Sequence, residues 1–257
     1  MKKLIVTTSW DDGHELDMRV ADILDAYGLR GTFYIAKDSC GSGSISNAHI
    51  KSLAKRHEIG GHTLTHPDLT KLPEEEALRE ITAGKEWLES LIGETIATFC
   101  YPYGLYNVEI KRLVKKAGFS AARTTETFAI HKPKDPHQTG TSIHAYPFPF
   151  RKKNKNQYLW MHLLEPALKN RGGIQKLSLP FSAFFGFPAL AKAVFDATRR
   201  EGDIYHLWGH SWELEKYDLW KEFERVCSYV SKRADCEYLT NGSAHLRMTD
   251  NIREEDQ

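Results

Sequence analysis

The 257-residue sequence is poor in cysteine, and its charges of opposite sign nearly cancel. It has 4 cysteines and no C-x-x-C pair, a pattern that matches neither a disulfide framework nor a cysteine-ligated zinc site and fits a reducing compartment. The 35 basic and 34 acidic residues give a formal net charge of +1, whereas nucleic-acid-binding proteins usually carry a strong basic excess. We therefore expect no nucleic-acid partner.

Long apolar runs are also missing. The start, MKKLIVTTSWDDG, lacks the apolar core of about 7–15 residues that a signal peptide needs. The most apolar stretch, residues 177–195, contains Ser, Pro, Gly and Lys and is a poor membrane span. These features predict a cytoplasmic protein without a membrane span.

What the sequence does have is an alternation of short β-branched or aromatic runs with amphipathic helical patterns. The expected strands are residues 4–9, 31–36, 58–63, 97–101, 120–125 and 204–208. The expected helices lie near residues 20–27, 47–56, 74–91, 110–117 and 219–230. Strands that alternate with helices form parallel sheets, so we predict an α/β protein whose sheet is either open or closed into a barrel.

Residues 132–180 break this alternation. They are rich in proline and aromatic residues, and Arg151, Lys152, Lys153 and Lys155 form a basic cluster. We interpret the chain as a single domain, 1–257, in which this segment is either an elaborated surface loop or a substrate-side insertion.

Two clusters of chemically active side chains follow the first and third predicted strands. Asp11 and Asp12 follow the first, where one carboxylate could serve as a base and the other as a metal ligand, although D-D-G is also a common turn. His62 and His66 follow the third, although H-x-x-x-H also arises by chance in a chain with 12 histidines. To share one ion, the two imidazoles must approach within roughly 3–4 Å, so the segment must be turned rather than extended.

A third cluster ends the late strand, where His206 and His210 lie among Trp208 and Trp212. A lone histidine is more often a core residue than a catalyst, but a tryptophan-rich environment can move the pKa of an imidazole toward a catalytic value. A carboxylate, an H-x-x-x-H pair and a late histidine, all at strand ends, together predict a metal site with open coordination positions.

These residues resemble three motifs of the polysaccharide deacetylase superfamily, carbohydrate esterase family 4. Its T-F-D-D-G motif corresponds to residues 9–13, its H-[ST]-x-x-H motif to residues 62–66, and its R-x-P-[YF]-G motif to residues 100–104. The resemblance spans roughly residues 4–210. It implies a distorted (β/α) barrel with about seven parallel strands, and metal-dependent N-deacetylation of an amino sugar or other carbohydrate substrate.

The resemblance also implies roles for individual residues. Asp12, His62 and His66 would hold a divalent metal, with Zn²⁺ as the expected ion. Asp11 would be the general base, and His210 the general acid, with His206 as a second candidate for the acid. The residues expected to line the substrate site are Tyr101, Pro102, Tyr103, Gly104, Trp208 and Trp212.

Two departures from the family pattern affect these roles. Cys100 stands where the family has the arginine that holds the base, and Arg123 is the candidate substitute, with an ordinary surface arginine as the alternative. We expect Arg123 to face inward and pair bidentately with Asp11. The D-x-x-D-W motif that tunes the acid histidine is also missing, and Trp208, Trp212 or Glu213 are candidates for that task.

The predicted function is therefore hydrolysis of an N-acyl group, with two alternatives. One is another metal-dependent C–N hydrolase, such as a deformylase or amidase acting on a small or nucleotide-linked substrate. The other is a non-catalytic carbohydrate-binding protein. A binding protein needs no base beside three metal ligands, so Asp11 favours an enzyme. The sequence leaves the oligomeric state open.

Overall fold

Parallel strands form the centre of the molecule, which a computed structural model describes for residues 3–37 and 39–255. Their order is β5-β4-β3-β2-β1-β9-β6, and β10 pairs with the first half of β1. The bounds are β1 (Leu4–Asp12), β2 (Gly31–Ile35), β3 (Glu58–Gly61), β4 (Thr98–Cys100), β5 (Ala121–Arg123), β6 (Ile143–His144), β9 (Ile204–Gly209) and β10 (Cys236–Tyr238).

One segment closes the sheet into a barrel. At one edge, Thr139 forms a bridge with Arg123 of β5, and four residues later Ile143 of β6 pairs with Leu207 of β9. The β1 residues at the centre are buried, and Trp10 is fully enclosed. The prediction of a distorted (β/α) barrel with about seven parallel strands is confirmed.

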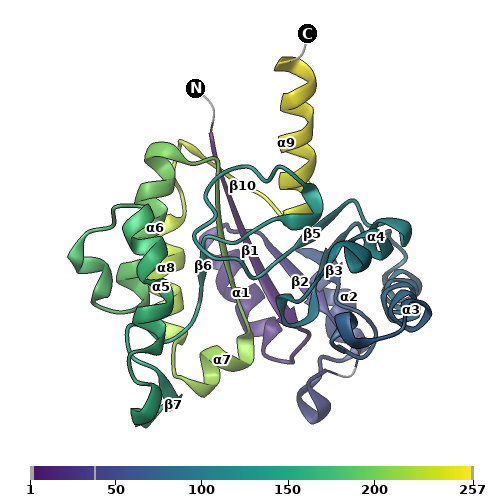
Figure 1. Cartoon of the computed structure of the whole chain (residues 1–257), viewed down its shortest axis with the longest axis horizontal. Coiled ribbons are helices and arrows are strands. Elements are labelled where there is room, and N and C mark those ends of the chain that lie inside the picture. Colours follow the sequence, from purple (N-terminus) through teal and green to yellow (C-terminus); the bar gives the residue numbers. More distant parts are fainter. Residues whose placement is uncertain (1–2, 38, 256–257) are drawn as a thin grey trace.

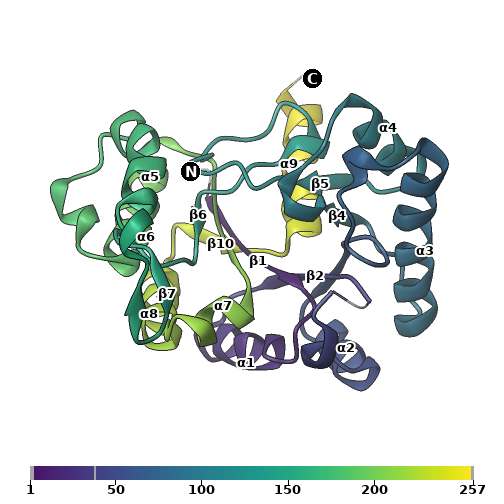
Figure 2. The same cartoon turned by 60° about the horizontal axis from the view of Figure 1, so that its bottom comes forward.

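Helices cover the outside of the barrel on both flanks. They are α1 (Asp17–Tyr27), α2 (Asn47–Ala54), α3 (Glu74–Ile92), α4 (Val108–Lys116), α5 (Glu165–Lys176), α6 (Phe187–Glu201), α7 (Ser211–Lys216), α8 (Trp220–Val230) and α9 (Asn241–Glu255). In both views α3 and α4 lie on one flank, and α5, α6 and α8 lie on the other (Figures 1 and 2). Within the described ranges, none of these helices combines the length and apolarity needed to cross a bilayer.

The helices form where the apolar spacing predicts them. In α4, Ile110, Leu113 and Val114 are buried along one face, which packs on the barrel. Gly28 and Gly118 follow the ends of α1 and α4 with φ of 68° and 85°, a left-handed conformation that glycine adopts without steric cost.

The proline-rich segment is more structured than its sequence pattern indicates. It contains β6, the hairpin of β7 (Lys152–Asn154) and β8 (Gln157–Tyr158), and α5. Residues 177–195, the most apolar stretch of the sequence, hold a 3₁₀ turn and the first part of α6.

Candidate active site

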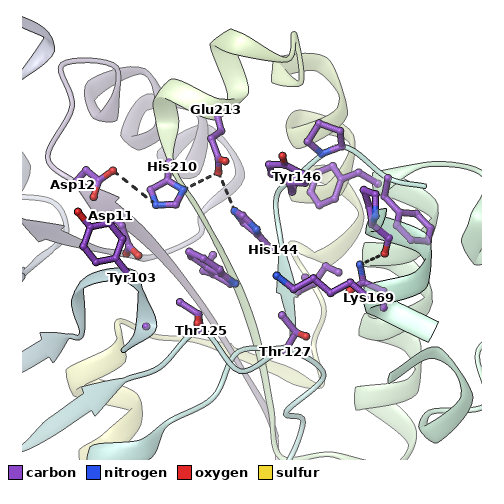
Figure 3. A pocket seen from close by; sticks show the side chains of 18 of the residues that line it. Asp11, Asp12, Tyr103, Thr125, Thr127, His144, Tyr146, Lys169, His210 and Glu213 are labelled. Atoms are coloured by element: carbon purple, nitrogen blue, oxygen red, sulfur yellow. Dashed lines mark hydrogen bonds and ion pairs between the residues drawn. The ribbon is translucent and has the colours of Figure 1, made fainter. Parts of the chain in front are cut away.

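A cavity of about 530 Å³ opens where β1, β3 and β9 end. Its inner wall holds the two aspartates of β1 together with His62, His66 and His210, which follow β3 and β9. Its outer wall comes from the proline-rich segment, including Tyr146 and Lys169 (Figure 3). Side chains from distant parts of the sequence therefore converge on one space, as expected at the carboxyl ends of parallel strands.

Three of these side chains have the geometry of a metal-binding set. Oδ1 of Asp12 lies 3.6 Å from Nε2 of His62 and 3.5 Å from Nε2 of His66. Ligand atoms about 2.0–2.2 Å from one tetrahedral ion are separated by roughly 3.3–3.6 Å, so these distances fit a shared ion. One oxygen and two nitrogen donors suit zinc and neighbouring divalent transition metals.

Local backbone conformation turns these donors toward one another. Asp12 has a φ of 81°, which departs from the strand geometry that would send consecutive side chains to opposite faces. His66 likewise has a positive φ of 62°, so the segment that carries the two histidines is turned, as predicted. Nδ1 of His62 donates a hydrogen bond of 2.7 Å to the carbonyl of Cys100, which leaves Nε2 free to bind a metal.

Helix α3 holds the loop that carries His62 and His66. The Glu80 carboxylate accepts hydrogen bonds from the backbone N–H groups of Leu64 and Thr65. Gly84, one turn further along α3, allows a close approach, because a Cβ placed there would lie 2.5 Å from the backbone carbon and oxygen of Thr63.

We expect Gly84→Ala to weaken metal binding roughly 10- to 100-fold, the usual cost of disturbing the groups that orient metal ligands. The added methyl must displace the backbone between the two histidines. Calorimetric titration with Zn²⁺ measures this effect. Gly172→Ala in α5 is the matched control, because a Cβ there meets no atom within 4 Å. Equal affinities in the two variants would contradict the expectation.

Asp11 lies beside the metal-binding set but faces a different partner. Its Oδ2 accepts a hydrogen bond from Nη2 of Arg123, whose side chain is only 1% exposed. The same nitrogen lies 2.9 Å from Sγ of Cys100. Burial raises the pKa of Asp11, but Arg123 and the neighbouring histidines together outweigh it and lower the pKa below its ordinary value.

The inward position predicted for Arg123 is confirmed, but the bidentate pairing is wrong. Nη1 donates instead to the carbonyl of Thr124, at 3.1 Å. Oδ1 of Asp11 is buried without a hydrogen-bond partner among the residues that the structure describes. One carboxylate oxygen is therefore held by Arg123, while the other is buried without a partner of its own among these residues.

A second network, centred on Glu213, lies next to the metal-binding set. Oε2 of Glu213 accepts hydrogen bonds from Nδ1 of His210, at 2.7 Å, and from Nε2 of His144, at 3.0 Å (Figure 3). Burial lowers the pKa of His210, but the carboxylates of Glu213, Asp11 and Asp12 together raise it above its ordinary value, with Glu213 contributing most. Nε2 of His210 lies 3.8 Å from Oδ2 of Asp12, at the edge of the metal-binding set.

The other candidate acid, His206, occupies a different place. Its Nε2 shares a hydrogen bond of 2.8 Å with the hydroxyl of Ser9, and it lines a small separate cavity. Burial lowers its pKa to about 3, so it is neutral at physiological pH. The geometry thus brings His210, rather than His206, to the large cavity.

The residues expected on the substrate side fall into different environments. Tyr103, Gly104 and Trp212 line the cavity, and the indole N–H of Trp212 also donates to Oδ2 of Asp12, at 2.9 Å. Trp208 lines it as well, and its ring stacks on His144 with centroids 4.0 Å apart. Tyr101 contributes to the lining, but its side chain is buried and its hydroxyl donates to the carbonyl of His137.

Pro102, at the start of the Pro102–Gly104 turn, is buried and is not among the described residues that line the cavity. The sequence-based prediction missed several residues that do line it, chiefly His144, Tyr146 and Lys169. The sequence signal for His144 is weak, because β6 is only two residues long and lies between proline-rich stretches.

Comparison with known proteins relates the first half of this site to a protein family. The model of the family described as polysaccharide deacetylase matches residues 1–122, which carry the aspartate pair, the histidine pair and the Tyr103 turn. Residues 1–122 of this chain thus match the polysaccharide deacetylase family. The match thus covers the metal-binding set and Asp11 but stops one residue before Arg123.

Curated relatives from this family match only part of their own length. YxkH of Bacillus subtilis (strain 168), named for a polysaccharide deacetylase, is 25% identical over 154 residues, which is 55% of this chain and 55% of YxkH. The peptidoglycan-N-acetylglucosamine deacetylase of Bacillus cereus is 29% identical over 104 residues, which is 40% of this chain and 37% of that enzyme. The chain therefore spans about half or less of these relatives.

The fold extends beyond the matched half. A Mycobacterium smegmatis structure named for the same family superposes with a TM-score of 0.68 at 17% identity, covering 98% of this chain and 92% of the other. The shared fold thus extends over the late strand β9, after which His210 follows.

Proposed function

We propose that this protein is a metal-dependent hydrolase that removes an N-acyl group, in the first instance N-acetyl, from an amino sugar. The observation that carries the proposal is the buried Asp11 carboxylate, with one oxygen on Arg123 and the other without a partner among the described residues. It lies next to a set of donors fit for a divalent metal. The Bacillus cereus relative, named for N-acetylglucosamine deacetylation, supports an amino-sugar substrate.

Asp12, His62 and His66 would hold the ion, and Zn²⁺ is the proposed metal because of the mixed nitrogen and oxygen donors. When bound there, a divalent ion supplies Lewis acidity for the acyl carbonyl and makes a nearby water more acidic. Burial and the neighbouring His62 lower the pKa of His66 to about 4, so its ring stays neutral and available as a ligand.

Asp11 acts as the general base in this proposal. Arg123 keeps the carboxylate ionised, and fixes its rotamer so that the free Oδ1 accepts the proton of the attacking water. The water oxygen then forms the new bond to the acyl carbon.

His210 acts as the general acid. Glu213 holds its Nδ1, so Nε2 faces the cavity and delivers a proton to the amine as the C–N bond breaks. The products are acetate and the free amino sugar. We also propose that the segment at about 132–180 forms the substrate side of the single domain, since it supplies the outer cavity wall. The cytoplasmic location stays a prediction.

The direct test is incubation of the metal-loaded chain with N-acetylglucosamine oligomers, followed by measurement of acetate and free amine in equal amounts. An enzyme that releases formate from N-formyl sugars but no acetate would favour the deformylase alternative. Binding of the oligomers without release of any acid would favour the carbohydrate-binding alternative.

We expect Glu213→Gln to shift the basic limb of the pH–rate profile to lower pH. The general acid must be protonated, and Glu213 raises the pKa of His210, so loss of the carboxylate lets His210 deprotonate earlier as the pH rises. The control is Glu215→Gln, which removes an exposed carboxylate from the same helix. A basic limb that stays in place would argue against His210 as the acid.

A further inference from the structure

Exposed apolar side chains are concentrated in one segment of this protein. Among the described residues, eight of the twelve large exposed apolar side chains lie between residues 150 and 185. They include Trp160, which is 77% exposed, and Met161, which is 91% exposed. Large exposed apolar side chains that gather in one place mark interaction surfaces rather than ordinary scatter.

Five of these side chains form a connected surface, which we name the aromatic patch: Phe150, Tyr158, Trp160, Phe181 and Phe185. Tyr158 lies 6.4 Å from Phe150 and 6.3 Å from Trp160, and Phe181 lies 5.7 Å from Phe185, between ring centroids. Phe150, Tyr158 and Phe185 line one groove, which connects the first group of rings, Phe150 to Trp160, with the second, Phe181 and Phe185.

Aliphatic residues extend the patch along α5 and the turn before it. Leu164 and Leu168 are exposed and one helical turn apart, and Met161 precedes them by about one turn. Lys169 of the same helix contributes to the cavity wall, as the close-up shows (Figure 3). The patch thus lies on the segment whose other side chains form the outer wall of the active-site cavity.

The same segment is strongly basic. Residues 150–186 contain seven lysines and arginines and one acidic residue, Glu165, which is paired with Arg151. Their formal net charge is +6, so the rest of the chain, whose total is +1, carries −5. Lys153 and Lys155 are exposed on the hairpin that also carries Tyr158.

We propose that the aromatic patch docks this protein on the surface of an anionic lipid bilayer. Exposed Trp, Phe and Leu side chains surrounded by lysines are the composition of elements that lie in a membrane interface, where the rings enter the headgroup region and the lysines meet anionic lipids. A protein partner fits less well, because lysine is depleted in protein–protein interfaces.

Sedimentation of the 257-residue chain with vesicles tests this proposal without reference to activity. We expect binding to vesicles of phosphatidylglycerol and phosphatidylcholine, weaker binding as salt is raised, and little binding to phosphatidylcholine alone. The variant Trp160→Ser/Phe181→Ser should lower the partition coefficient on the order of tenfold. Lys153→Glu/Lys155→Glu should lower it by a similar factor.

Matched controls separate the patch from general surface effects. Leu246→Ser removes an exposed leucine from α9, and Lys51→Glu/Lys55→Glu reverses two exposed charges at α2, so both should bind vesicles like the unaltered chain. Circular dichroism checks that every variant is folded. Absence of binding to anionic vesicles, or equal binding by the patch and control variants, would overturn the proposal. So would a dimer in solution that only the patch variants dissociate, which would assign the surface to a second copy.

Discussion

Asp11→Asn should reduce the rate of deacetylation roughly 10²- to 10⁴-fold, the usual contribution of general acid–base catalysis, while metal binding is retained. The same substitution should lower the free energy of unfolding by roughly 3–5 kcal/mol. Arg123 is buried against Asp11, and removal of the carboxylate charge leaves the guanidinium without a counter-ion. Steady-state kinetics and denaturant unfolding measure the two effects separately.

A double variant shows whether lost activity is only a result of lost stability. Replacing Arg123 with Met in the Asp11→Asn background removes the uncompensated charge, so stability should partly recover while activity stays low. The control Asp22→Asn alters an ion pair in which the aspartate is 69% exposed and should change neither property strongly. Recovery of activity together with stability would assign Asp11 a structural role only.

Metal removal should abolish activity, and zinc should stabilise the metal-free chain. At a free concentration 100 times the dissociation constant, a bound ion raises the melting temperature of a protein of this size by roughly 5–10 °C. His66→Ala should lose this shift, because it removes one of the three donors around the shared site.

The matched control is His144→Ala. His144, His210 and Glu213 also lie close enough to hold an ion, so a metal bound there would lose the temperature shift in this variant instead. We expect His144→Ala to keep the shift. The opposite pattern would move the metal site to the Glu213 network and contradict the proposed roles of Asp12 and His66.

The barrel could be predicted from the sequence because its strands and helices have clear periodicity. The first five strands and most helices lie within a few residues of their predicted bounds, and Gly28 follows the end of α1 as expected. The strand that closes the barrel was not predicted, since β6 has two residues and follows a stretch interrupted by Pro133 and Pro136. Short strands of this kind are defined by their neighbours rather than by their own composition.

Local motifs indicated half of the candidate site. Asp12, His62 and His66 were recognisable because their spacing reflects the chemistry of metal binding, and the structure brings them together. The hydrogen bond between Glu213 and His144 could not be predicted. The two residues are 69 positions apart, and no local pattern in a single sequence relates them.

Arg123 also has a consequence for how such a site can change during evolution. Cys100 of β4 and Arg123 of β5 are direct neighbours in the strand pairing, and both side chains contact the same carboxylate oxygen of Asp11. If an ancestor carried its arginine at position 100, the transfer took two substitutions. If the arginine at position 100 is lost first, Asp11 stays buried without a cation. If Arg123 is gained first, two guanidinium groups must share one buried space. Either intermediate is costly. Descendants of such a transfer should therefore keep Arg123, because either reversal passes through the same costly intermediates.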